Sequence, residues 1–298
     1  MKTYDITLLT AQHYLDPADP DWYVQQILHE DLLLREALER KGLRVHRIDW
    51  TNKEFDWSST GTVLFRAVWD YTERYDEFIR FLHAVSARTT MINPLKIILW
   101  NLDKHYLHDL EKLGVNIPET TYIEKNTSTS LQHLYSIQGS RESIIKPVMS
   151  AGARHTYRLN GNNLSQHESI FQQLVAVEAM MMQPFLHSVT THGEKTLVVI
   201  GGKFTHAVIK KAKPGDFRVQ DDFGGTVHHY IPTNEEIAFA ERTVSACVPI
   251  PLYGRVDILR DNNDQLAVSE LELIEPELWF RFHPPAAQLL AEEIVKII

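Results

Sequence analysis

Residues 254–276 read GRVDILRDNNDQLAVSELELIEP, and this stretch predicts a β-hairpin near the C-terminal end of the chain. Arg255–Leu259 and Gln265–Ile274 are predicted as its two strands. Between them, Asp261–Asp264 is a cluster of residues that favour turns. The sequence therefore places a hairpin rich in acidic residues near the C-terminal end.

The register of this hairpin decides which acidic side chains share a face. A four-residue loop puts Asp257 opposite Val268 and Arg255 opposite Glu270. Glu270 and Glu272 are two residues apart, so they point to the same face of their strand. In this register Asp257 joins them, diagonal to Glu270.

Three carboxylates on one face repel each other unless a positive charge lies among them. Oxygen ligands in this number suit Mg²⁺, which takes one or two carboxylates and completes its shell with water and phosphate oxygens. The alternative is a solvated acidic face in which Arg255 pairs with Glu270. The residues alone leave both interpretations open.

The composition indicates an ordinary globular protein of 298 residues, 44% of them hydrophobic and 23% charged. This excludes intrinsic disorder, and the single cysteine, Cys247, excludes an internal disulfide. With 30 basic and 39 acidic residues the formal net charge is −9, which argues against nucleic acid as a partner. We find no signal peptide and no apolar run of membrane-spanning length, so the sequence predicts a cytoplasmic protein without a membrane partner.

The first hundred residues alternate strands and helices, which predicts an open α/β sheet. The expected strands are 4–10, 43–48 and 62–67, and the expected helices are 22–41, capped by Asp21, and 75–86. A further helix is expected over 102–113. From Glu142 onward short strands dominate, with one helix over 166–177 and a two-residue turn at Gly201-Gly202. The fold class expected is therefore α/β followed by α+β.

Two lysines precede features that suit phosphate binding. Lys104 follows Asn101-Leu102-Asp103 at the start of a predicted helix, and Lys146 ends the apolar strand Ile144-Ile145. Ser150–Ala153 is a run of small residues between two strands, as expected of a loop that covers phosphates. Each signal alone is equally compatible with an exposed lysine.

The order of these and other segments resembles that of the ATP-grasp ligases, over about residues 66–279. The segments that carry the resemblance are Asp103-Lys104 and Gly114–Pro118, Ile145-Lys146-Pro147, Met182–Phe185, Gly193-Glu194, Arg218, Gly224-Gly225, Arg255-Val256-Asp257 and Glu270–Pro276. Trp69-Asp70-Tyr71 and Glu270–Pro276 look like the branch that contains glutathione-synthetase-like enzymes and the D-cycloserine-forming cyclo-ligase. Trp69 itself suits either the core or a substrate wall.

The resemblance implies an open α/β N-terminal domain (residues 1–100) and a two-subdomain ATP-grasp fold (101–186 and 187–298). It also implies an ATP site in which Lys104 and Lys146 bind the phosphates and the loop with Ser150 and Gly152 covers them. The backbone at Gln183, Phe185 and Leu186 would hold adenine at a hinge, and Glu194 would lie near the ribose.

The same resemblance implies a reaction centre beside the ATP site. Asp257, Glu270 and Glu272 would hold two Mg²⁺ ions, with Mn²⁺ as the alternative ion. Arg218 would steady the transferring phosphoryl group. Lys210 stands in the basic run Lys210, Lys211 and Lys213 just before Arg218, which suits either a solvated loop or a contact on the phosphate side. The substrate would contact Arg66, Gly224, Gly225 and Arg255.

The function implied is an ATP-dependent ligase that activates a carboxylate as an acyl phosphate and condenses it with an amine. Its partners would be small-molecule carboxylate and amine substrates, joined within one molecule or between two, and the protein would be a homodimer or homotetramer. The alternative is an ATP-binding regulatory or partner-binding module without turnover. A kinase that stops at the phosphorylated product is a third interpretation.

Overall fold

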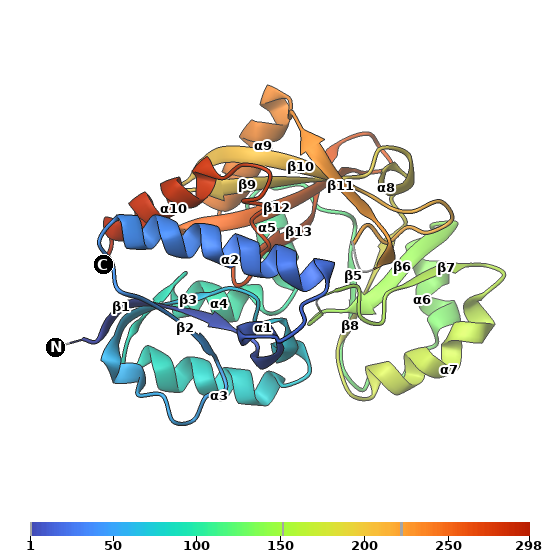
Figure 1. The fold of residues 1–298 in the computed structure, drawn as a ribbon. Coiled ribbons are helices and arrows are strands. Elements are labelled where there is room, and N and C mark those ends of the chain that lie inside the picture. Colours follow the sequence, from blue (N-terminus) through green and yellow to red (C-terminus); the bar gives the residue numbers. More distant parts are fainter. Residues whose placement is uncertain (1, 151, 221–222) are drawn as a thin grey trace.

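A computed structural model of the chain describes residues 2–150, 152–220 and 223–298. Its strands form three sheets that follow one another along the sequence (Figure 1). The sheets lie at residues 4–92, 121–184 and 194–272. The predicted domain boundaries after residues 100 and 186 fall between strands of different sheets, and the domains themselves remain a prediction.

The first sheet is parallel and has the strand order β2-β1-β3-β4, as the alternating pattern predicts. Its strands are β1 (Tyr4–Thr10), β2 (Val45–Asp49), β3 (Thr60–Phe65) and β4 (Thr90–Ile92). Its helices and short helical turns are α1 (Gln12–Leu15), α2 (Trp22–Arg40), the 3₁₀ turns η1 (Trp57–Ser59) and η2 (Trp69–Thr72), and α3 (Tyr75–Ser86). The Asp21 side chain accepts a hydrogen bond from the Val24 N–H at 2.8 Å, which confirms the predicted cap of α2.

The second sheet is antiparallel and has the order β5-β8-β6-β7. Its strands are β5 (Thr121–Ile123), β6 (Glu142–Pro147), β7 (Tyr157–Asn160) and β8 (Met180–Pro184). Helices α6 (Leu131–Gln138) and α7 (Leu164–Val175) share a hydrophobic core with it. Met180, Met181 and Met182 are fully buried, so this run is a core strand.

The third sheet is antiparallel and has the order β11-β10-β9-β12-β13. Its strands are β9 (Glu194–Ile200), β10 (Lys203–Lys211), β11 (Thr226–Tyr230), β12 (Tyr253–Arg260) and β13 (Leu266–Glu272). Gly201 and Gly202 connect β9 to β10 with φ angles of 58° and 76°, which confirms the predicted tight turn. The remaining helices are α4 (Leu95–Asn101), α5 (Tyr106–Lys112), α8 (Ser188–Thr191), α9 (Asn234–Ser245) and α10 (Pro285–Val295).

The hairpin β12–β13 forms as predicted, but its predicted register is wrong. Asp257 pairs with Glu270, and Arg255 pairs with Glu272. Next to the turn, Arg260 pairs with Leu266 and Ile258 with Val268, which is already one residue beyond the predicted register. A bulge between Asp257 and Ile258 adds a second residue along β13. Together the two shifts place Asp257 directly opposite Glu270 instead of diagonal to it.

One hydrophobic core joins the first sheet to the third. It contains Ile6 and Leu8 of β1, Leu34 of α2, Val198 of β9 and Leu290 of α10. Figure 1 shows α10 lying along α2. The N-terminal sheet is therefore packed against the C-terminal sheet. No helix in the described ranges is both long and apolar enough to cross a membrane.

Candidate active site

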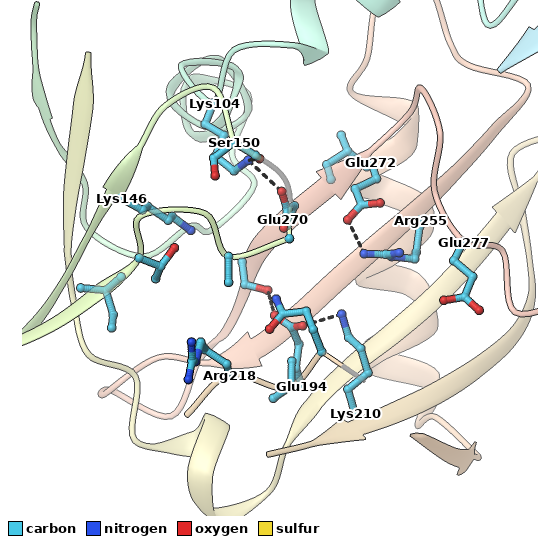
Figure 2. Close-up of a pocket in the computed structure, with 18 of the residues that line it drawn as sticks. Lys104, Lys146, Ser150, Glu194, Lys210, Arg218, Arg255, Glu270, Glu272 and Glu277 are labelled. Carbon is cyan, nitrogen blue, oxygen red and sulfur yellow. Dashed lines mark hydrogen bonds and ion pairs between the residues drawn. The ribbon is translucent and has the colours of Figure 1, made fainter. Parts of the chain in front are cut away.

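A cavity of about 480 Å³ is lined by residues from all three regions of the chain. Thirteen of the side chains predicted for the site line it: Lys104, Lys146, Ser150, Gly152, Gln183, Phe185, Leu186, Glu194, Lys210, Arg218, Arg255, Glu270 and Glu272. Figure 2 shows most of these converging from different strands and loops. A cavity of this size is within the range of small-molecule sites. Ala151, in the predicted covering loop, lies outside the described residues.

The acidic side chains of the hairpin form a close group at this cavity. Asp257, Glu270 and Glu272 each offer a carboxylate oxygen, and these oxygens lie within 4.8 Å of one another. Asp257 is 1% exposed, and burial would raise its pKa, but Arg255 and Lys210 hold that pKa at about 2. Burial raises the pKa of Glu272 to about 8, and the charges of Glu270 and Asp257 add to this rise although Arg255 opposes it. A hard cation with oxygen ligands fits this donor set.

Two basic side chains hold the acids together on the protein side. Arg255 lies 2.9 Å from Asp257 and also pairs with Glu272. The Lys210 ammonium lies 2.8 Å from Asp257 and 2.6 Å from Glu194. Burial lowers the pKa of Lys210, but Asp257 and Glu194 together raise it above its usual value. Lys210 and Arg255 are therefore both charged at neutral pH.

The part of the cavity at Lys104, Lys146, Ser150 and Gly152 is called the lysine end. The Lys104 ammonium donates to the Ser150 carbonyl at 2.6 Å and lies 2.9 Å from Glu270. Lys146, by contrast, forms no hydrogen bond or ion pair with any described residue, and burial lowers its pKa. A half-buried ammonium that no described residue pairs with is available for an anionic ligand.

Beyond the lysine end, Gln183, Phe185 and Leu186 continue the wall. The Gln183 amide donates to the Thr120 hydroxyl at 2.9 Å, which fixes its orientation. The guanidinium of Arg158 covers the Phe185 ring at 3.8 Å from its centre. One face of the Phe185 ring is therefore covered by the protein itself.

Arg66 is predicted to contact substrate, but the structure does not bring it to the cavity wall. It is 4% exposed and forms ion pairs with Glu30 at 2.6 Å and Asp31 at 3.1 Å. Both partners lie on α2, and the guanidinium also donates to the Pro276 carbonyl at 3.4 Å, so the protein itself satisfies it.

Gly224 and Gly225 also lie away from the described wall. A Cβ on Gly225 would lie 2.2 Å from the Val219 carbonyl oxygen, so this glycine allows the backbone to turn back on itself. Gly225 therefore serves to form the turn. The neighbouring residues that line the cavity are Arg218, Val219 and Gln220.

The opposite part of the wall was not predicted from the sequence, apart from Trp69, for which two interpretations were open. It is called the aromatic end and consists of Tyr14, Tyr23, Trp69, Tyr71, Glu275, Glu277 and Trp279. The Trp69 indole N–H donates to the Glu275 carbonyl at 3.1 Å. Glu275 stands in the same acidic motif as Glu270 and Glu272, which is the signal that could have identified it.

Two family models match separate parts of the chain. Residues 6–93 match the N-terminal domain of D-cycloserine synthetase DcsG, and residues 110–248 match the ATP-grasp domain of prokaryotic glutathione synthetase. The cycloserine biosynthesis protein DcsG of Streptomyces lavendulae is 30% identical over 284 residues, covering 88% of this chain and 92% of that protein. The chain belongs to the ATP-grasp ligase family.

Solved structures agree with this assignment. The crystal structure of D-cycloserine synthetase DcsG has a TM-score of 0.87 and 27% identity, over 98% of each chain. The ATP-grasp ligase PsnB, complexed with a precursor variant, Mg and ADP, has a TM-score of 0.64 and 15% identity over 99% of each chain, a likeness of fold.

The predicted fold and activity are confirmed. The protein is an ATP-dependent ligase with an ATP-grasp fold. It condenses a carboxylate with an amine-type nucleophile and so forms a C–N bond. The alternative of a binding module without turnover is not favoured. As in the family generally, ATP and Mg²⁺ are used.

Proposed function

We propose that this ligase closes a ring within one amino-acid-like substrate, by activating its carboxylate as an acyl phosphate. The observation that carries the proposal is the origin of the aromatic end. Four of its side chains, Tyr14, Tyr23, Trp69 and Tyr71, come from the region that matches the DcsG N-terminal model. That relative is named for a cyclic product, D-cycloserine.

We assign the lysine end to the triphosphate of ATP. Lys146 has no partner in the described chain, and Lys104 is already oriented by the Ser150 carbonyl. The loop that begins at Ser150 and includes Gly152 would close over the phosphates, while the segment Gln183–Leu186 would hold adenine. Glu194 accepts a hydrogen bond from the Ser269 hydroxyl at 2.8 Å and would lie beside the ribose.

We assign Asp257, Glu270 and Glu272 to two Mg²⁺ ions, which Mn²⁺ could replace. The close carboxylate oxygens and the high pKa of Glu272 support this assignment, because both indicate too little positive charge among these acids. When bound, the metal neutralises phosphate charge.

The protein's own groups would act mainly by position and charge. A carboxylate oxygen of the substrate attacks the γ-phosphorus, and ADP leaves. Arg218, oriented by Asp216 at 2.8 Å, would stabilise the transferring phosphoryl group, with Lys210 beside it. Arg255 would orient the substrate carboxylate. A nitrogen of the same substrate then attacks the acyl carbon, phosphate leaves, and the nitrogen loses a proton to solvent.

The test is to incubate the protein with Mg-ATP and single amino acids that carry a nucleophilic nitrogen in the side chain. ADP and phosphate release are measured, and the mass of the product is determined by mass spectrometry. Loss of one water from a single substrate supports ring closure, whereas a product containing two substrates overturns it. A stable phosphorylated compound would identify a kinase, and absence of stimulation by any acid would contradict the proposal as a whole.

Two further expectations remain predictions. A homodimer or homotetramer is checked by sedimentation velocity. A cytoplasmic location is checked by cell fractionation.

A further inference from the structure

The aromatic end contains polar groups that the reaction with ATP does not use. Figure 2 shows Glu277 beyond Arg255, on the side of the cavity away from Lys146. Glu275 and Trp279 line the same end. These three residues belong to one segment, which directly follows the metal-binding strand assigned above.

This segment is held rigidly by the N-terminal domain. The Glu30 carboxylate accepts hydrogen bonds from the Leu278 N–H at 2.6 Å and the Phe280 N–H at 3.1 Å. Arg66, paired with Glu30, donates to the Pro276 carbonyl at 3.4 Å, and Trp69 donates to the Glu275 carbonyl. Side chains on a segment fixed at four backbone positions can bind a small ligand precisely.

Trp279 has a buried donor without an acceptor. The residue is 4% exposed, and its indole N–H has no hydrogen-bond partner among residues 2–150, 152–220 and 223–298. Its backbone has a φ of 56°, a conformation that costs energy for a bulky residue. Trp279 lines the cavity but its N–H has almost no accessible surface, so a ligand oxygen becomes its acceptor when the indole turns toward the cavity.

Glu275 has a buried carboxylate without a cation. It is 8% exposed, and within the described chain its carboxylate forms no ion pair with a Lys, Arg or His. The Tyr71 hydroxyl and the backbone N–H of Glu275 itself hydrogen-bond to it, and the charge of Lys104 acts on it without pairing. Glu277 differs, because Arg281 pairs with it. A carboxylate removed from water in this way is stabilised by a positively charged ligand group.

We propose that Glu275 and Trp279 recognise the amino-acid end of the substrate. The Glu275 carboxylate accepts hydrogen bonds from the substrate ammonium, and the Trp279 indole N–H donates to a substrate oxygen. In an α-amino acid the ammonium and the reacting carboxylate are on the same carbon. A carboxylate held at Arg255 therefore leaves its ammonium inside the cavity, whose wall contains both Arg255 and Glu275. This inference rests on the proposed function.

The experiment compares D- and L-amino acids with the corresponding 2-hydroxy acids, in which a hydroxyl replaces the ammonium. The wild-type protein should release ADP with amino acids and prefer them over hydroxy acids by at least about 10-fold in kcat/KM. Glu275→Gln should lose most of that preference and leave the KM for ATP unchanged. The control is Glu54→Gln, an exposed acid outside the cavity, which should retain the preference.

A second variant tests the indole separately. Trp279→Phe removes the N–H, which has no hydrogen-bond partner among the described residues, and it also makes a buried ring smaller. Thermal stability should therefore fall to some extent whatever the role of the indole, whereas the KM for the amino acid should rise by about 3- to 10-fold and the KM for ATP should not change. An unchanged KM for the amino acid in the folded variant would overturn this part of the inference.

Failure of the inference differs from failure of the proposed function. If amino acids and hydroxy acids support equal turnover, or if Glu275→Gln keeps the preference, the recognition role is wrong and the ligase assignment stands. If no acid stimulates ADP release by the wild-type protein, the proposed function and the inference are both contradicted.

Discussion

The two ends of the cavity hold opposite charges that the protein itself leaves incompletely neutralised. At the lysine end the incompletely neutralised charge is the ammonium of Lys146, which no described residue pairs with. At the aromatic end it is the carboxylate of Glu275, which has a tyrosine hydroxyl as its partner. Each charge is at least half-buried, so each lowers the stability of the free protein. We infer that the missing counter-charges come from the ligands, a triphosphate at one end and an ammonium at the other.

The two ends also differ in how widely their chemistry is shared. A triphosphate is the same in every ATP-dependent ligase, so lysines in a recognisable order are sufficient to indicate its site. The aromatic end is built by the N-terminal domain and by the segment after β13, which are brought together only by folding. This is the end at which related ligases can differ in substrate.

The largest effect is expected where the two ends meet, at Glu270. Glu270→Gln should lower ADP release by at least about 100-fold, because it removes a charge from the proposed metal ligands. The side chain is 30% exposed, so the fold should tolerate the change. ADP release is measured beside circular dichroism, with Glu54→Gln as control. Unchanged turnover in a folded Glu270→Gln protein would remove Glu270 from the metal site.

The next test separates the two lysines of the lysine end. Lys146→Met should lower ADP release by about 10- to 100-fold through weaker phosphate binding, without loss of stability, since its ammonium has no partner among the described residues. Lys104→Met should in addition destabilise the protein by about 1–3 kcal/mol, because it leaves Glu270 and the Ser150 carbonyl unpaired. Thermal unfolding of both variants without ATP checks the difference. Equal destabilisation would mean that Lys146 has a structural partner.

The aromatic end should respond to pH through Glu275. Burial raises its pKa to about 7 from 4.5, although the Tyr71 hydroxyl opposes the rise. Between these values the folded protein keeps a proton that the unfolded chain has lost, so the free energy of unfolding falls as pH rises.

Glu275→Gln removes this loss of stability at high pH, because the Gln side chain does not ionise. At pH 8 the variant should be more stable than the wild type by about 1–3 kcal/mol, and below pH 4.5 the two should be alike. Chemical denaturation at pH 4, 6 and 8 measures the difference. A stability difference that does not change with pH would show that the pKa of Glu275 is the same in the folded protein and in the unfolded chain.

The sequence predicted most of the lysine end and little of the aromatic end, for a physical reason. Lys104, Lys146 and the acids of β13 lie in local patterns that report their own strands and turns. The grouping of Asp257 with Glu270 was predicted although the register was wrong. The bulge beside Asp257 is a backbone irregularity that no residue pattern marks.

Arg66 shows what local patterns cannot report. Its partners Glu30 and Asp31 lie 36 and 35 residues away, and the segment that it supports lies 210 residues away. An arginine at the end of a strand suits a substrate contact equally well until the helix that carries Glu30 is in place. The unpredicted helix α10 is of the same kind, because packing on α2 stabilises it, whereas α9 carries a local signal in the capping box of Thr233 and Glu236.

The smallest effect tests whether the N-terminal domain positions the aromatic end. Trp69→Phe keeps an aromatic ring but removes the hydrogen bond to the Glu275 carbonyl. One such bond contributes about 1 kcal/mol, so the KM for the carboxylate substrate should rise by roughly 5-fold. The KM for ATP should not change, because Trp69 is at the aromatic end and the lysines are at the other. If both KM values rise together, the two ends are coupled through the fold, and the separation between a shared nucleotide end and a specific substrate end is wrong.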